Sequence, residues 1–460
     1  MTITISHKVI NSPLYALLKL AIPISLQTAI FSSKSIIDTL MLGKLSAFDI
    51  AAIGFASKAQ LIIIFFIIGL SIGGGQVAAQ CWGSIKTDDY KFKKSIIIIL
   101  LLSFLAALLF FIPLSYFSRE IMAMGTQSNE IITRGSDYLE ITAYSLFFFA
   151  YTSTLATGLR VMHQPMVATV ISTIGVGLNI VLNWLLIFGH WGMPAMGIQG
   201  AAIGTLISAI IETLCLFAFL LYQRHRLAFL PLNLLRSITA QDIKTVAQLS
   251  MTAAINSIVW ALGLFAFHAL LGKTDANLLI ALAVLTPIEA LSMALLIGLS
   301  NAASIIIGNH VGADRFDLVK TDSRRMLQVS IVFGVITALI LWATQTTVID
   351  WFYVGTSSAR SLTEQLYNIM ALSIVIKSLS MMFIVGILRA GGDARFCLYT
   401  DIFAQWVFLL PCTAFLAYTL QLDAVFLYSL IIIEESLKIL ICIARLRSGK
   451  WITNLSKCMS

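Results

Sequence analysis

The chain has 460 residues, of which 59% are hydrophobic and only 11% are charged. A soluble protein carries about a quarter charged residues, so the composition excludes a soluble globular fold. The net charge of +8 does not call for a nucleic-acid partner, because basic loops that face anionic lipid account for it. The expected surroundings of this chain are therefore a lipid bilayer.

Apolar segments long enough to cross about 30 Å of hydrocarbon recur along the whole chain. They predict an all-α integral membrane protein. Twelve spans are expected, at residues 14–41, 50–81, 92–114, 128–159, 165–188, 197–222, 242–271, 277–309, 326–350, 362–388, 396–418 and 424–446.

The second half of the sequence repeats the first at an offset of 229 residues, without a gap over a long stretch. Residues 68–71 fall on the identical residues 297–300, and Arg160 falls on Arg389. Such a duplication is the usual construction of secondary transporters, whose binding site lies at the interface between the repeats.

The repeat predicts two lobes of six helices, an N-lobe at 1–222 and a C-lobe at 246–460, joined by a basic cytoplasmic linker at 223–245. An even number of crossings per repeat leaves both repeats in the same orientation. The lobes should therefore be related by an axis along the membrane normal.

The placement of basic residues predicts the topology. With the N-terminus in the cytoplasm, the loops and tails on that side carry 21 Lys or Arg, and the opposite loops carry six. This positive-inside asymmetry predicts a multi-pass protein of the cell (inner) membrane with both termini in the cytoplasm.

Sequence signals of catalysis and of cofactor binding were not found. The six cysteines have no CxxC spacing, and the six histidines form no HExxH pair. The glycine run at 73–75 lacks the Gly-Lys-Ser/Thr that would complete a phosphate-binding loop, so direct use of ATP is not expected. No nucleophile–base pair falls within a span, and we expect neither an enzyme nor a bound cofactor or metal.

Ionisable residues within a span mark transport pathways or proton relays, because they are costly to place in lipid. Lys34 and Asp38 are four residues apart in the first predicted helix, so they share one face. In the second repeat Gly263 and Phe267 stand at these positions. The pair is therefore either a structural ion pair or a titratable carboxylate that faces a cavity, with Lys34 tuning it.

Three polar residues in the fifth and sixth predicted helices are possible partners of that carboxylate. Asn179 and Asn183 share a face, and Thr205 lies in the next helix. Such residues either join neighbouring helices by hydrogen bonds or bind a carboxylate whose protonation changes. Pro23, in the first helix, either permits a bend or only packs.

Other charged residues within or at the ends of spans are expected to form ion pairs inside each lobe. Three pairs are predicted: Arg160 with Glu212, Arg389 with Glu435, and Glu289 with Lys377.

An ordered set of short motifs resembles the multidrug and toxic compound extrusion (MATE) transporters over nearly the whole chain. The motifs lie at residues 37–43, 69–83, 179–189, 197–202, 386–393 and 434–438. The resemblance implies two six-helix lobes that form a V-shaped cleft with alternating access. It also implies export of bulky, often cationic, small organic molecules by antiport against protons or sodium ions.

The same resemblance implies roles for individual residues. An aspartate at the position of Asp38 would couple transport to the ion, with Asn179, Asn183 and Thr205 as polar partners and a bend near Pro23. Many relatives carry a second aspartate where this chain has Asn183, and this departure favours protons. Lys377 at mid-span, with no acid in the seventh helix, places the chain nearer the DinF-like branch. We expect a functional monomer; the alternative function is a flippase for lipid-linked saccharides of the same superfamily.

Overall fold

A computed structural model describes residues 13–42, 46–85, 89–228, 232–273, 276–352 and 357–459, and every element in these ranges is helical. The elements are α2 (Pro13–Leu42), α3 (Ala47–Gly83), α4 (Tyr90–Tyr116), α5 (Ser118–Ala123), α6 (Asn129–Ala143), α7 (Ser145–Val161), α8 (Pro165–Phe188), η1 (His190–Gly192), α9 (Gly197–Tyr222), α10 (Leu232–Arg236), α11 (Ala240–Gly272), α12 (Ala276–Gly312), α13 (Phe316–Phe352), α14 (Ser357–Met381), η2 (Met382–Leu388), α15 (Ala394–Asp401), η3 (Ile402–Leu409), α16 (Leu410–Tyr418), α17 (Ala424–Ser448) and η4 (Leu455–Cys458). The predicted all-α fold class is confirmed.

Ten helical spans in the described ranges are long and apolar enough to cross a membrane, and they fall in ten of the predicted ranges. The predicted span 128–159 is covered by α6 and α7, which are separated by Tyr144. The predicted span 424–446 is covered by α17, which has 25 residues but carries three charged residues near its middle.

The helices form two compact units whose limits differ from the predicted lobes. The N-terminal unit contains residues 30–254 and 456–459, and the C-terminal unit contains residues 13–29 and 255–455. The predicted limits at the linker are therefore not the limits of compact units. The long helices α2 and α11 each contribute one end to each unit.

Small residues explain this exchange of helix ends. In the N-terminal unit, α3 approaches the backbone of α11 so closely that a Cβ on Gly69 would lie 2.5 Å from Cα of Ala254. In the C-terminal unit, a Cβ on Gly298 of α12 would overlap Ser25 of α2. Both members of the second contact stand 229 residues from their counterparts in the first. The same helix crossing is thus built twice, and small residues permit it.

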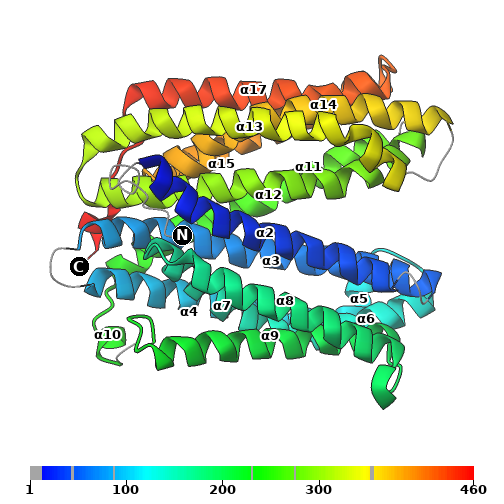
Figure 1. Ribbon diagram of the computed structural model, residues 1–460, viewed down its shortest axis with the longest axis horizontal. Helices are drawn as coiled ribbons and strands as arrows, with labels where there is room; N and C mark the ends of the chain where they lie inside the picture. Colours follow the sequence, from blue (N-terminus) through cyan, green and yellow to red (C-terminus); the bar gives the residue numbers. More distant parts are fainter. Residues whose placement is uncertain are drawn as a thin grey trace, which may run out of the picture. The chain divides into compact units, whose positions relative to one another are not determined.

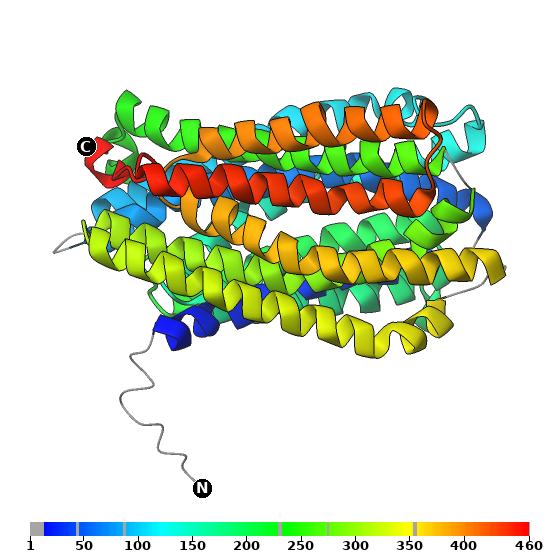
Figure 2. The ribbon, with the colours of Figure 1, turned by 90° about the horizontal axis from the view of Figure 1, so that it is seen from above.

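Within each unit the long helices pack side by side. In the N-terminal unit α8 packs along α9, and α3 packs against α4, α6 and α7 (Figure 1). In the C-terminal unit α14 packs against α12, α13 and α17, and α17 (red) lies beside η3 (orange) in Figure 2.

Two segments of the described chain, η2 and η3, are π-helical, and both belong to the C-terminal unit. The equivalent residues of the first repeat, 153–159 and 173–180, lie in the regular helices α7 and α8. The two repeats therefore differ in backbone geometry as well as in side chains.

The last described residues pack into the N-terminal unit. The side chain of Met459 is 2% exposed. Its sulfur lies 3.6 Å from Sγ of Cys81 and 3.2 Å from Oγ of Ser95. Lys91 Nζ donates to the carbonyl oxygen of Met459 at 2.5 Å. This end of the described chain is therefore held by both its side chain and its backbone.

The helix crossing gives a first prediction. Gly69→Ala should destabilise the protein by about 1–3 kcal/mol, because the added methyl group meets backbone rather than a side chain that can move. Gly54→Ala in the same helix is the matched control, since nothing lies within 4 Å of the added carbon. It should be neutral or stabilise by up to about 1 kcal/mol. Thermal unfolding of the two purified variants makes the comparison, and equal melting temperatures would contradict the close crossing.

Candidate functional site

Polar side chains from three helices of the N-terminal unit form a continuous chain of hydrogen bonds. Asn183 Nδ2 in α8 donates to Asp38 Oδ1 in α2 at 2.7 Å, and lies 3.4 Å from Asn179 Oδ1. Asn179 Nδ2 donates to Thr205 Oγ1 in α9 at 3.3 Å. The four residues that the sequence singled out are therefore brought together. We call them the Asp38 cluster.

Sequence reasoning missed Tyr138 of α6. This side chain is 6% exposed, and its hydroxyl lies within hydrogen-bonding reach of Ser57 in α3 and of Thr205. Its ring also lies close enough to Asp38 for the two groups to interact electrostatically. Tyr138 is one of 12 tyrosines, and no spacing in the sequence distinguishes it.

The amide of Asn183 is held by a glycine. Asn183 is fully buried, and its Oδ1 has no hydrogen-bond donor. The same oxygen lies against Gly204 of α9, where a Cβ would overlap it. Gly204 therefore leaves the space that lets Asn183 face Asp38.

Lys34 lies near the Asp38 cluster without pairing with it. Among the described side chains, Lys34 forms no ion pair with Asp38, although its charge acts on both Asp38 and Glu212. Glu212 Oε1 instead accepts a hydrogen bond from Ser172 at 2.8 Å. The predicted pairing of Glu212 with Arg160 is therefore not formed, since α8 supplies the partner.

In the C-terminal unit one of the predicted ion pairs is confirmed and another is wrong. Glu289 and Lys377 form a buried ion pair. Arg389 does not pair with Glu435, because it donates to Asn256 Oδ1 at 2.7 Å. The π-helix η2 directly precedes Arg389, and it turns the following residue away from the face that an α-helix would give it.

The position equivalent to Asp38 is apolar in the C-terminal unit. Phe267 is fully buried, and its ring stacks at 6.4 Å on the ring of Tyr428. At the position equivalent to Lys34, the absent side chain of Gly263 leaves room for Gln405. The Asp38 cluster therefore has no copy at the equivalent position of the second repeat.

The expected bend at Pro23 is not a break in the helix. α2 continues through Pro23 as one helix from Pro13 to Leu42. Pro23 is buried next to Ile24, which belongs to the core of the C-terminal unit. The packing alternative describes this state, and bending stays a prediction.

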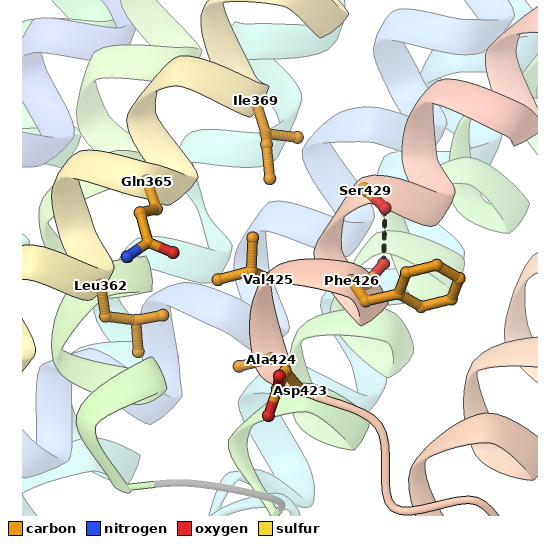
Figure 3. Close-up of a pocket in the computed structure, with 8 residues that line it drawn as sticks. All are labelled: Leu362, Gln365, Ile369, Asp423, Ala424, Val425, Phe426 and Ser429. Carbon is orange, nitrogen blue, oxygen red and sulfur yellow. Dashed lines mark hydrogen bonds between the residues drawn. The ribbon is translucent and has the colours of Figure 1, made fainter.

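A hollow of about 620 Å³ lies between α14 and α17 in the C-terminal unit (Figure 3). Its wall consists of Leu362, Gln365, Ile369, Asp423, Ala424, Val425, Phe426 and Ser429. Ser429 Oγ is already bonded to the carbonyl oxygen of Phe426 at 2.6 Å, and the only acid, Asp423, is exposed. The hollow offers no buried ionisable group, so the Asp38 cluster remains the candidate site.

The sequence matches a known family in both halves. The MatE family model matches residues 23–185 and again residues 252–415. The chain belongs to the MatE family. The two matches begin 229 residues apart, which is the offset of the internal repeat. Membership of this family of membrane transporters is consistent with the absence of catalytic motifs in the sequence.

Similar proteins share most of their length with this MatE chain. The probable multidrug resistance protein YoeA of Bacillus subtilis is 24% identical over 87% of this chain and 86% of its own length. The multidrug resistance protein NorM of Photobacterium profundum is 27% identical, with 86% of each chain covered. Assignment to the DinF-like branch stays a prediction.

Solved structures share the fold. A MOP superfamily transporter from Pyrococcus furiosus superposes with a TM-score of 0.85 at 17% identity, covering 97% of this chain and 99% of that one. A mutant of the Vibrio cholerae MATE transporter VcmN gives 0.84 at 18% identity, covering 98% and 100%.

The buried Glu289–Lys377 pair gives a second prediction. Lys377→Met should destabilise the protein by about 3–5 kcal/mol, because it leaves Glu289 buried without its counter-charge. The double variant Glu289→Leu/Lys377→Met should recover most of this loss. Melting temperatures of the single and double variants decide the point. Equal losses in both would mean that packing, not charge pairing, is what Lys377 provides.

Proposed function

We propose that this protein exports bulky, often cationic organic compounds in exchange for protons, and that Asp38 binds and releases the exchanged proton. The observation that carries the proposal is the direct hydrogen bond between Asn183 and Asp38 inside a membrane-spanning unit. An ionisable group at that depth is costly unless it has a function. The names of the relatives, multidrug resistance proteins, supply the substrate class.

The Asp38 cluster suits a carboxyl group that changes its protonation state. An ionised carboxylate only accepts hydrogen bonds, and the Nδ2 of Asn183 donates one. A protonated carboxyl group must donate, and the buried Oδ1 of Asn183 has no other donor. Rotation of the amide by half a turn would therefore satisfy the protonated form with the same residue.

The composition of the cluster favours a proton over sodium. Asp38 is the only carboxylate in the hydrogen-bonded chain, and its neighbours are two amides, a threonine and the nearby Tyr138. One negative charge suffices to hold one proton, whereas a sodium site would be strengthened by a second acid, which Asn183 replaces. Sodium coupling is therefore the alternative that the transport experiment must separate.

We further propose that both termini lie in the cytoplasm, that the protein acts as a monomer in the cell membrane, and that the site is exposed to the two sides in turn. The distribution of 21 basic residues against six supports this orientation. The internal repeat supports alternating access, because duplicated units usually provide the two arrangements.

The deciding experiment uses inverted membrane vesicles with imposed gradients. Ethidium transport should follow a pH gradient and not a sodium gradient. In Asp38→Asn it should fall to the level of vesicles without the protein, at equal expression. Asp350→Asn, which changes an exposed acid, is the control and should transport normally. Full transport by Asp38→Asn would exclude Asp38 as the coupling group. Movement of a lipid-linked saccharide in place of ethidium would favour the flippase.

The contact between Gly204 and Asn183 gives a separate prediction. Gly204→Ala should push the amide away from Asp38 and slow transport about tenfold or more, since a hydrogen bond to a charged group is lost. Gly177→Ala, in α8 with nothing within 4 Å of the new carbon, should keep the parental rate. If both variants transport alike, the position of the Asn183 amide is not important for coupling.

A further inference from the structure

A second group of ionisable side chains lies buried in the C-terminal unit, outside the Asp38 cluster. It comes from α12, α14, α15, α17 and the residue after η2, and each member is at most 8% exposed. The members are Glu289, Lys377, Arg389, Asp401, Glu434, Glu435 and Lys438.

Lys438 is the centre of this group. Its Nζ lies 2.6 Å from Glu434 Oε1, 3.4 Å from Glu435 Oε1 and 3.6 Å from Asp401 Oδ1. One ammonium group thus faces three carboxylates. We call these four residues the Lys438 cluster.

Hydrogen bonds connect the Lys438 cluster to the remaining charges. Asn256 Nδ2 donates to Asp401 Oδ2 at 2.7 Å, and Arg389 Nη2 donates to Asn256 Oδ1 at 2.7 Å. Ser380 Oγ donates to Glu435 Oε2, and its other hydrogen-bond partner is the carbonyl oxygen of Lys377 at 3.2 Å. The charges are therefore connected as one network.

Further titratable groups surround the network on the packed helices. His268 interacts with Glu289 and Lys377, and Tyr428 interacts with Glu289. Cys397 and Cys442 interact with Asp401. Asp393, which also faces Cys397, is bonded to Arg445 at 2.6 Å and so carries its own counter-charge. None of these groups adds an unbalanced positive charge.

The network has an excess of acids. Glu289, Asp401, Glu434 and Glu435 face three cations, Lys377, Lys438 and Arg389. If all were ionised, one negative charge would be buried without compensation, which is strongly unfavourable. Glu434 Oε1 also lacks a hydrogen-bond donor, because the nearby ammonium lies outside hydrogen-bond geometry. The charge count and this unpartnered oxygen both require something positive.

Backbone geometry marks the same place independently. The π-helix η2 runs between Ser380 and Arg389, and η3 starts directly after Asp401. π-Helical turns are rare and occur mostly at functional sites, because they cost regular hydrogen bonding. Both π segments of the described chain adjoin this network.

The position of the network also differs from that of the Asp38 cluster along the repeat. Asn256 stands 11 residues before Phe267, the equivalent of Asp38. In a helix this displacement is about 16 Å, or three turns. The network is therefore not a degenerate copy of the first site but a separate one.

We propose that the Lys438 cluster binds one exchangeable proton, shared among Asp401, Glu434 and Glu435, as a second proton site of this protein. A single proton supplies the missing positive charge, and a protonated carboxyl group can donate to a neighbouring carboxylate. In the described part of the chain, no three acidic, histidine or cysteine side chains converge as metal ligands would, which favours a proton over a metal ion. The site is a binding property and holds whether or not the protein exports drugs.

Infrared difference spectroscopy of the purified protein in lipid nanodiscs, taken between about pH 6 and about pH 9, tests the proposal through the carbonyl stretch of protonated carboxyl groups. Glu434→Gln, Glu435→Gln and Asp401→Asn should each abolish one band, because removing any one acid balances the network without a proton. The band should persist in Asp38→Asn and in the control Glu364→Gln, a partly exposed acid. Persistence in all three cluster variants, or loss in Asp38→Asn, would overturn the proposal. So would a band that responds to sodium at constant pH.

Thermal stability provides a second measurement that needs no spectral assignment. A folded state that binds an extra proton loses stability as pH rises through its release. The melting temperature of the parent protein should therefore fall toward about pH 9 more than that of Glu434→Gln, which has no proton to lose. Parallel pH profiles for the two proteins would contradict a proton held by this cluster.

Discussion

The close crossing of helices at Gly69 and Gly298 is the constraint on which the rest of the architecture depends. Lipid provides no hydrophobic force between helices, so tight backbone contact through small residues is what holds them together. At these crossings α3 packs on the first part of α11, and α12 packs on the first part of α2. Each compact unit therefore contains a helix end that belongs, by sequence, to the other repeat.

On this shared scaffold the two repeats carry different chemistry. Asp38 bonds to Asn183 across 145 residues, and Asn256 bonds to Asp401 across the same separation. The helix pairs thus have the same register, but their polar residues stand three turns apart along the repeat. In lipid each buried polar group must find a partner, so the choice of polar positions gives each unit its own properties without changing its packing.

Periodicity and composition were sufficient to predict the spans, and the internal repeat predicted two equivalent halves. The Asp38 cluster was predictable because Asn179 and Asn183 share a helix face and Asp38 has no counterpart in the second repeat. The limits of the compact units were not, because the exchange of helix ends depends on tertiary contacts at single glycines. The predicted pair of Arg389 with Glu435 was wrong because a π-helix before Arg389 leaves no pattern in the sequence. Tyr138 was missed because one hydroxyl among many aromatic residues has no periodic signal.

The packing of Met459 limits how the protein is best handled. Since its side chain is buried beside Cys81 and its carbonyl oxygen is held by Lys91, this part of the chain is structure rather than a loose tail. A fluorescent reporter or affinity handle joined directly after it would compete with that packing, and purification through such a handle would select molecules in which the contact is disturbed. A handle placed ahead of α2, or separated by a flexible spacer, leaves the contact intact.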